Sequence, residues 1–242
     1  MKKILIAVMA LAMIFVIASC SKSSATTTTA ATTTTQTTTT ATTTAAATPS
    51  TGTVDTEYDP NKTVDFVQQT NENNRVVTVG TIDKSLYKTP VFVTSFGQST
   101  DAAMLETVMK KLGVEYVYNT TAQASALANY KTVVIAVGAS TKGLGAAGIS
   151  ESEERARATQ IMDFIKANNI EVICCHIGGS ARRGTLSDVF ADMVMAESSL
   201  IVLKEDANFD YKFTKYAEEK NIPISLVYAT KDTLTVFTDV FN

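Results

Sequence analysis

The chain has 242 residues, of which 45% are hydrophobic and 19% charged, and its formal net charge at pH 7 is −3. A mildly acidic chain is a poor binder of nucleic acid, because such binding needs clustered Lys and Arg. Beyond the first three residues, basic side chains are adjacent only in isolated pairs, such as Arg182 and Arg183, and form no larger cluster. Composition therefore argues against a nucleic-acid partner, and the length is sufficient for one domain with a substantial core.

The N-terminus has the parts of a secretion signal. Two lysines precede an apolar stretch from Ile4 to Ile17, which is shorter than the roughly 20 residues that a membrane-spanning helix needs. The stretch ends in Ile17-Ala18-Ser19-Cys20, which resembles the lipobox of bacterial lipoproteins. The resemblance implies that residues 1–19 are a signal peptide, that Cys20 is lipidated, and that the protein is extracytoplasmic and anchored to a bacterial membrane.

Two polar segments follow the signal. Residues 20–54 are almost entirely Thr, Ala and Ser, with no apolar periodicity that could bury a face. Such a segment cannot offset the entropy of its own ordering, so we predict a disordered tether. Residues 55–88 form a polar N-terminal extension with one candidate strand, Arg75 to Val79, and the sequence leaves open whether they join the folded body.

From residue 89 onward, short β-branched runs alternate with segments of helical period. This alternation predicts a single three-layer α/β domain over residues 89–242, with a mostly parallel sheet of five or six strands, flavodoxin-like or Rossmann-like. For the first five strands we expect the spatial order 2-1-3-4-5. The predicted strands are Val91 to Thr94, Glu115 to Tyr118, Thr132 to Val137, Glu171 to His176, Leu200 to Lys204 and a weaker Ile224 to Tyr228.

Two helix starts have the spacing of a capping box, in which a hydroxyl and a carboxylate three residues later satisfy free backbone amides. The first is Ser150 with Glu153, and the second is Thr185 with Asp188. We therefore expect helices to begin at these two points.

Cys174, Cys175 and His176 are consecutive in an apolar run. Adjacent cysteines rarely form an unstrained disulfide, and consecutive side chains of a strand point to opposite faces. The string is therefore a poor metal site, and the His spacing of zinc enzymes is absent. We expect two buried cysteines, no metal and no cofactor.

Ligands of open parallel sheets bind beyond the carboxyl ends of the strands, where successive crossovers diverge. The first loop at this point, Thr94 to Asp101, brings Ser95, Gln98, Ser99 and Thr100 to a helix start. Hydroxyls beside the positive end of a helix can hold an anion, and the loop resembles the phosphate loop of flavodoxins, although the chain has no Trp to stack on a flavin. Ordinary helix capping explains the hydroxyls almost as well.

The second loop at this edge, Gly138 to Gly148, is rich in glycine. Its G-x-G-x-x-G string, which starts at Gly143, comes too late after the strand for a dinucleotide fingerprint. We predict a mobile lid that carries Lys142 over the sheet edge, with a merely flexible connector as the alternative.

The third loop follows the fourth strand and contains the only histidine and the basic pair. A Gly-Gly turn followed by two guanidinium groups would suit a carboxylate or a phosphate, whereas solvated arginines are the alternative. The predicted ligand-binding residues are Ser95, Gln98, Ser99, Thr100, Lys142, Gly143, His176, Gly178, Gly179, Arg182 and Arg183.

These strings together resemble an uncharacterised family of bacterial secreted or lipid-anchored α/β proteins, a domain of unknown function. The resemblance covers about residues 89–242 and implies membership but no activity. It rests on Thr89-Pro90-Val91, Ser95-Phe96-Gly97-Gln98-Ser99, Lys142-Gly143-Leu144-Gly145-Ala146-Ala147-Gly148-Ile149, His176-Ile177-Gly178-Gly179 and Ala181-Arg182-Arg183-Gly184.

We expect a lipid-anchored protein that binds a small anionic ligand outside the cytoplasm, as an accessory of a transporter or sensor. One alternative is a hydrolase or transferase that acts on a phosphate or carboxylate ester with His176 as general base. No Gly-x-Ser-x-Gly elbow or Walker loop supports it, so the sequence favours binding over catalysis. The other alternative is a structural or protein-interaction domain.

Overall fold

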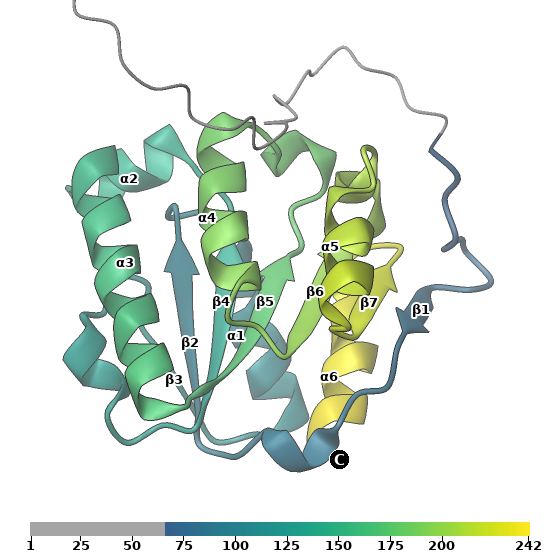
Figure 1. Cartoon of the computed structure of the whole chain (residues 1–242), viewed down its shortest axis with the longest axis horizontal. Coiled ribbons are helices and arrows are strands. Elements are labelled where there is room, and N and C mark those ends of the chain that lie inside the picture. Colours follow the sequence, from purple (N-terminus) through teal and green to yellow (C-terminus); the bar gives the residue numbers. More distant parts are fainter. Residues whose placement is uncertain (1–65) are drawn as a thin grey trace, which may run out of the picture. The chain divides into compact units, whose positions relative to one another are not determined.

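The computed structural model describes residues 66–242, which fold around one seven-stranded sheet (Figure 1). Its strand order is β1-β7-β6-β5-β4-β2-β3, and every neighbouring pair is parallel except β1 with β7. The predicted order 2-1-3-4-5 is confirmed for β2 to β6. The strands are β1 Val76–Val79, β2 Val91–Phe96, β3 Tyr116–Tyr118, β4 Thr132–Val137, β5 Glu171–His176, β6 Leu200–Lys204 and β7 Ile224–Val227.

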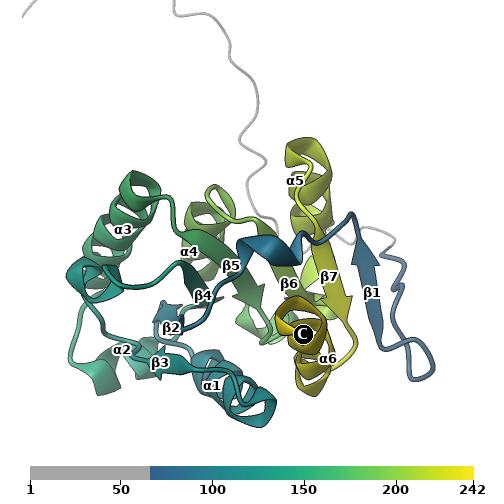
Figure 2. The ribbon, with the colours of Figure 1, turned by 90° about the horizontal axis from the view of Figure 1, so that it is seen from below.

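Helices cover both faces of the sheet, which gives the predicted three layers (Figure 2). α1 (Asp101–Leu112) and α6 (Thr233–Phe241) pack on one face, and α3 (Glu151–Asn168), α4 (Thr185–Met195) and α5 (Lys212–Lys220) pack on the other. Among residues 66–242, no helix is long and apolar enough to cross a membrane. The predicted signal peptide, the predicted lipidation site Cys20 and the predicted tether lie outside the described residues.

The central strands are buried along their whole length, because helices cover them on both sides. Every residue of β2 and of β4 is buried, as is typical of strands inside a parallel sheet. Cys174 packs into the cluster under α3, α4 and α5, and Cys175 into the cluster under α1 and α6. The two cysteines are free thiols, as expected, and burial raises the pKa of each.

The polar extension joins the folded body from residue 66. β1 pairs antiparallel with β7 and closes that edge of the sheet. Upstream of β1, the buried carboxylate of Glu205 accepts hydrogen bonds from the backbone amides of Gln69, at 2.6 Å, and Thr70, at 2.7 Å. The backbone amide of Val67 donates to the hydroxyl of Tyr211. These contacts fasten residues 67–70 to the segment after β6.

Of the two predicted capping boxes, one is confirmed. Ser150 Oγ accepts from the Glu153 amide, and the Glu153 carboxylate accepts from the Ser150 amide at 2.7 Å. The box predicted at Thr185 is wrong, because α4 is preceded by Gly184 without a side-chain cap. The Asp188 carboxylate is unavailable for capping, since Arg183 binds both of its oxygens.

The glycine-rich lid is also a wrong prediction. Residues Thr141–Ala147 form a short helix, α2, in which the Ser140 side chain caps the first turn by accepting from the Gly143 amide at 3.0 Å. At the other end, Gly148 adopts the left-handed conformation that terminates helices. Caps at both ends thus offset the low helix propensity of the internal glycines.

We expect Gly143→Ala and Gly145→Ala, both within α2, to have opposite effects on stability. A Cβ at Gly143 would collide with the backbone carbonyl of Gln98, whereas a Cβ at Gly145 meets nothing within 4 Å. Gly143→Ala should lower the free energy of unfolding by about 1–3 kcal/mol, and Gly145→Ala should raise it by about 0.5–1 kcal/mol. Urea unfolding of the two variants measures both changes in the free energy of unfolding. Equal changes would contradict the structure of α2.

Candidate ligand-binding site

The loops after β2 and β4 touch each other directly at the point where the crossovers diverge. Gln98 and Ala139 form an isolated bridge, and the Ser140 amide donates to the Gly97 carbonyl at 2.8 Å. Gly97 has a φ of +91°, and a Cβ there would lie 2.6 Å from the carbonyl oxygen of Gly138. The backbone of the two loops therefore fills the crevice in which a ligand was expected.

Gln98 and Ser95 are held inside the protein. The Gln98 amide group donates to the Thr120 carbonyl at 2.8 Å and to the Glu154 carboxylate at 3.2 Å. Glu154, fully buried, pairs with Arg157, which in turn donates to the Ser95 carbonyl. The Ser95 hydroxyl is buried beneath this network. Neither predicted side chain is placed to meet a ligand at the surface.

Beside this closed crevice, the start of α1 meets the turn after β5. The Ser99 hydroxyl accepts from the Asp101 amide at 3.3 Å, and Arg182 Nη2 lies 3.5 Å from Thr100 Oγ1. A Cβ on Gly178 would lie 2.5 Å from Asp101 Oδ2 and would overlap Arg182 Cγ. We call these five residues, Ser99, Thr100, Asp101, Gly178 and Arg182, the edge cluster.

Asp101 is the member of the edge cluster that the sequence reasoning missed. The residue is only 7% exposed, and Oδ2 has no hydrogen-bond partner among residues 66–242. Burial raises its pKa, while the Ser99 hydroxyl and the charge of Arg182 act in the opposite direction. Its place directly after a run of hydroxyl residues, at the first helical position, was the signal that could have found it.

Gly179 lies on the other side of the same turn, with a φ of +74°. A Cβ there would lie 2.6 Å from Asp206 Oδ1 and 2.8 Å from Lys204 Nζ. Lys204 pairs with Asp206 Oδ2 at 2.6 Å, and Asp206 Oδ1 is buried without a partner in the described part of the chain. The two glycines thus leave room for a carboxylate on each side of the turn.

His176 lies beneath the edge and not on it. Its ring is fully buried, packs edge to face on Phe213 with 5.3 Å between ring centroids, and forms no hydrogen bond within residues 66–242. Burial, followed by the Arg183 charge, lowers its pKa to about 4, while nearby backbone groups and the Asp188 charge act in the opposite direction. A sealed neutral imidazole cannot reach a substrate as a general base.

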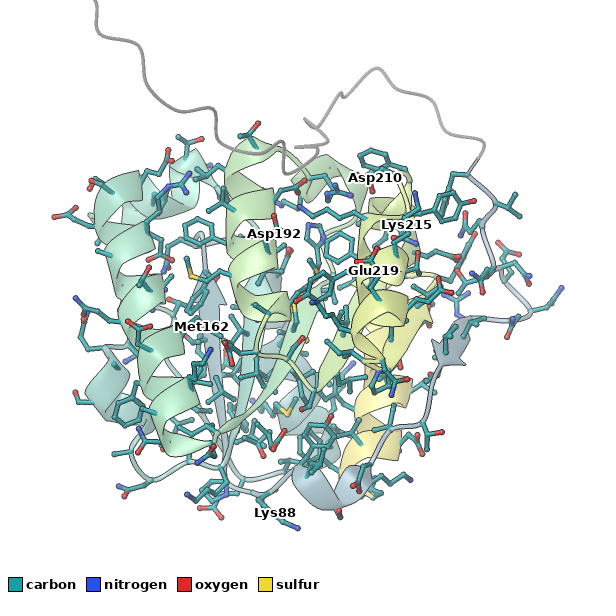
Figure 3. All side chains as sticks on the ribbon, viewed as in Figure 1. Lys88, Met162, Asp192, Asp210, Lys215 and Glu219 are labelled. Carbon is teal, nitrogen blue, oxygen red and sulfur yellow. The ribbon has the colours of Figure 1, made fainter. Side chains whose placement is uncertain are left out.

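Arg183 is a structural residue. Its side chain is fully buried, and its five N–H groups donate to the carboxylate of Asp188, the carbonyl of Ala207 and the carboxylate of Asp210. Asp210 lies near the carboxyl ends of the strands (Figure 3). The guanidinium also stacks on the rings of Phe209 and Phe213. No donor of Arg183 remains for a ligand.

Lys142 stands apart from the edge cluster, in the first turn of α2, where it is exposed and forms no ion pair within residues 66–242. Gly143, next to it, packs on the Gln98 carbonyl. Of the eleven predicted residues, the structure thus brings Ser99, Thr100, Gly178 and Arg182 together, with Gly179 adjacent.

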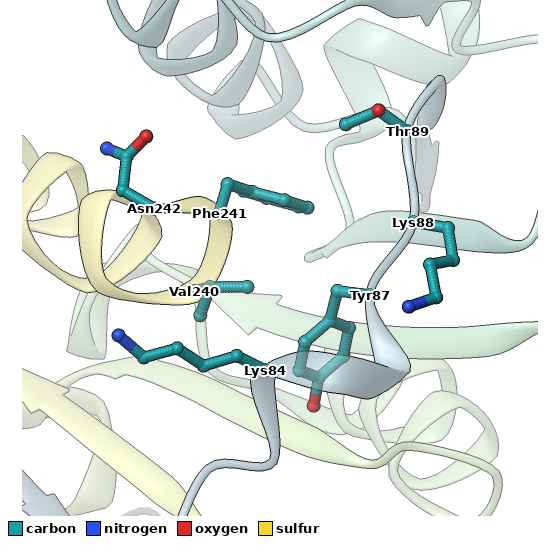
Figure 4. Close-up of a pocket in the computed structure, with 7 residues that line it drawn as sticks. All are labelled: Lys84, Tyr87, Lys88, Thr89, Val240, Phe241 and Asn242. Atoms are coloured by element: carbon teal, nitrogen blue, oxygen red, sulfur yellow. The ribbon is translucent and has the colours of Figure 1, made fainter.

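Two surface hollows lie elsewhere. One, of about 380 Å³, opens between the segment before β2 and the end of α6, where Lys84, Tyr87 and Phe241 line it (Figure 4). The other, of about 320 Å³, lies beside α3. Neither is lined by a predicted site residue. Within residues 66–242, no group of three His, Cys, Asp or Glu side chains is arranged to hold a metal ion.

A family model described as Domain of unknown function (DUF6305) matches residues 88–241. The chain belongs to this family. The match confirms the resemblance to an uncharacterised family and gives the DUF6305 domain no activity. No curated protein matches the chain in sequence.

Two solved structures are similar at low level to the chain that contains the DUF6305 domain. A protein assigned as an acylhydrolase from Bacteroides fragilis is 15% identical, with a TM-score of 0.25, over 55% of this chain and 64% of the other. A GDSL-like lipase from Bacteroides thetaiotaomicron is 16% identical, with a TM-score of 0.26, over 55% of this chain and 65% of the other. The chain thus spans less than two thirds of either relative, and the similarity is too low to inform function.

Replacing the two neighbouring arginines should separate their roles in the DUF6305 domain. Arg183→Ala leaves Asp188 and Asp210 without their buried partner, so the free energy of unfolding should fall by about 3–5 kcal/mol. Arg182→Ala removes no ion pair and should change it by less than about 0.5 kcal/mol. Urea unfolding provides the comparison, and similar losses would contradict the assignment of Arg183 as the structural residue.

The buried histidine should make the DUF6305 domain less stable in mild acid. Because the folded pKa, about 4, lies below the unfolded value near 6.5, the unfolded state binds an extra proton between these pH values. His176→Phe keeps the ring contact with Phe213 and cannot bind this proton. Its free energy of unfolding, relative to that of the wild type, should therefore rise by about 3 kcal/mol as the pH falls from 7 to 4. Parallel urea unfolding curves across this range measure the gain, and a pH-independent difference would contradict it.

Proposed function

We propose that this protein binds a small anionic ligand at the edge cluster, outside the cytoplasm, as an accessory of a transporter or sensor. The observation that carries the proposal is the state of Arg182. Arg182 is a half-buried residue whose guanidinium lies beside the start of α1, and it forms no ion pair within residues 66–242.

The other cations at this edge are already neutralised or lie apart. Arg183 is bound by two carboxylates and Lys204 by Asp206, whereas Lys142 stands on α2. The free amides at the start of α1, a helix of 12 residues, add partial positive charge beside Arg182. A guanidinium in this position can donate two parallel hydrogen bonds to one carboxylate or phosphate.

The proposed location rests on the lipobox-like segment that ends at Cys20 and on the Thr-rich tether of residues 20–54. A flexible chain of that length has a root-mean-square reach of about 30 Å. A lipid on Cys20 would hold the binding domain within that distance of the membrane, where a transporter or sensor would meet it.

The enzyme alternative loses the general base that was suggested for it. It needs His176 as general base, and this side chain, the only histidine of the sequence, is sealed beneath the sheet edge. The protein-interaction alternative needs no pocket. It would be favoured if no small ligand raised the Tm.

A thermal-shift screen with small carboxylates and with inorganic phosphate tests the proposal. A ligand at 100 times its Kd adds about 2.7 kcal/mol to the free energy of unfolding, which raises the Tm of a domain of this size by about 5–10 °C. Arg182→Ala should weaken binding about 10- to 100-fold by removing charge-assisted hydrogen bonds. Lys110→Ala, which removes an exposed cation from the other end of α1, is the control and should bind like the wild type. A shift that persists unchanged in Arg182→Ala, or no shift with any compound, would overturn the proposal.

A further inference from the structure

We propose that the ligand is a zwitterion of the α-amino-acid type, whose carboxylate binds Arg182 and whose ammonium group binds Asp101. The inference rests on the proposed function and names the ligand class for the same site. It starts from the second charged group of the edge cluster, which a purely anionic ligand would leave unused.

Asp101 has unused hydrogen-bonding capacity. Its side chain is more than nine-tenths buried, and Oδ2 accepts no hydrogen bond within residues 66–242. A buried acceptor without a donor destabilises the folded protein, and most buried polar atoms in proteins are paired. A position at the first turn of α1 explains why a carboxylate is favourable there. It does not explain why one of the oxygens lacks a donor.

Asp101 and Arg182 flank a single glycine without pairing with each other. Asp101 Oδ2 and Arg182 Cγ both lie against the point where a Cβ of Gly178 would stand. The guanidinium extends from there to within 3.5 Å of Thr100 Oγ1. These opposite charges lie near each other without an ion pair between them, so one molecule that carries both charges can pair with both groups.

The second carboxylate of this turn is a useful contrast. Asp206 also has a buried oxygen, Oδ1, without a partner in the described part of the chain, but Lys204 pairs with its other oxygen, Oδ2, at 2.6 Å. The Lys204 ammonium thus already does for Asp206 what a ligand ammonium would do for Asp101. Of the two carboxylates at this turn, Asp101 is the one that forms no ion pair within residues 66–242.

An ammonium group suits Asp101 better than a hydroxyl. It carries three donors and a positive charge, whereas a hydroxyl offers one donor. Hydrogen bonds to charged groups contribute about 1.5–3 kcal/mol, which corresponds to a preference of about 10- to 100-fold over a ligand that lacks the donor.

Glycine, glycolate and acetate provide the test, because they share one carboxylate and differ only in the group on the next carbon. NMR titration of the wild-type chain should give a Kd for glycine about 10- to 100-fold below that for acetate, with glycolate between them. Asp101→Asn should abolish this preference and leave acetate binding unchanged, and Arg182→Ala should weaken all three. Asp206→Asn, on the other side of the turn, is the matched control and should keep the preference.

The outcomes distinguish this inference from the function on which it rests. Equal binding of glycine and acetate, both weakened in Arg182→Ala, would overturn the zwitterion and leave the anion site standing. Glycolate binding as tightly as glycine would also overturn it, since a hydroxyl would then suffice. No binding of any of the three, with no response to phosphate, would overturn both. If Asp101→Asn fails to fold, the Kd values of glycine, glycolate and acetate for the wild-type chain still test the zwitterion proposal.

Discussion

The buried guanidinium of Arg183 is the interaction on which the carboxyl edge of the sheet depends. It joins the turn after β5 to Asp188 in α4 and to Asp210 before α5, and the rings of Phe209 and Phe213 lie against it. Such a network contributes less to net stability than its number of hydrogen bonds suggests, because desolvation offsets much of the attraction. Its effect is to fix one conformation of the turn after β5. This conformation places the side chain of the preceding residue, Arg182, at the start of α1.

The sequence predicted the layers of the fold better than the roles of its polar residues. Periodicity is a local property, so the strands from β2 to β7 could be inferred from it, and the order of β2 to β6 followed from the usual topology of open parallel sheets. Whether an arginine is free or paired depends on partners elsewhere in the chain, and Asp210 lies 27 residues beyond Arg183. The local sequence around Arg182 and Arg183 therefore does not show whether both side chains are exposed or one of them is buried in ion pairs.

The candidate site shows the same limit. A glycine-rich segment predicts a loop, so the sequence did not predict α2. The structure shows that Ser140, just after β4, caps this helix. Proximity to one sheet edge correctly grouped Ser99, Thr100, Gly178 and Arg182, because parallel strands end together. His176, on the same edge in sequence, ends beneath it, since the side chains of a strand alternate between faces. Asp101 was missed because its significance lies in a missing partner, which no sequence pattern records.

The attachment of residues 67–70 has a mechanical consequence. Because the Gln69 and Thr70 amides are bound to Glu205, tension that enters the described chain at residue 66 is resisted first by these hydrogen bonds. Only after they break does the load reach β1 and its pairing with β7. The segment after β6 carries both Glu205 and Asp206, which flanks Gly179. A pull from the N-terminal side is thus transmitted to the rim of the proposed binding edge before it reaches the core.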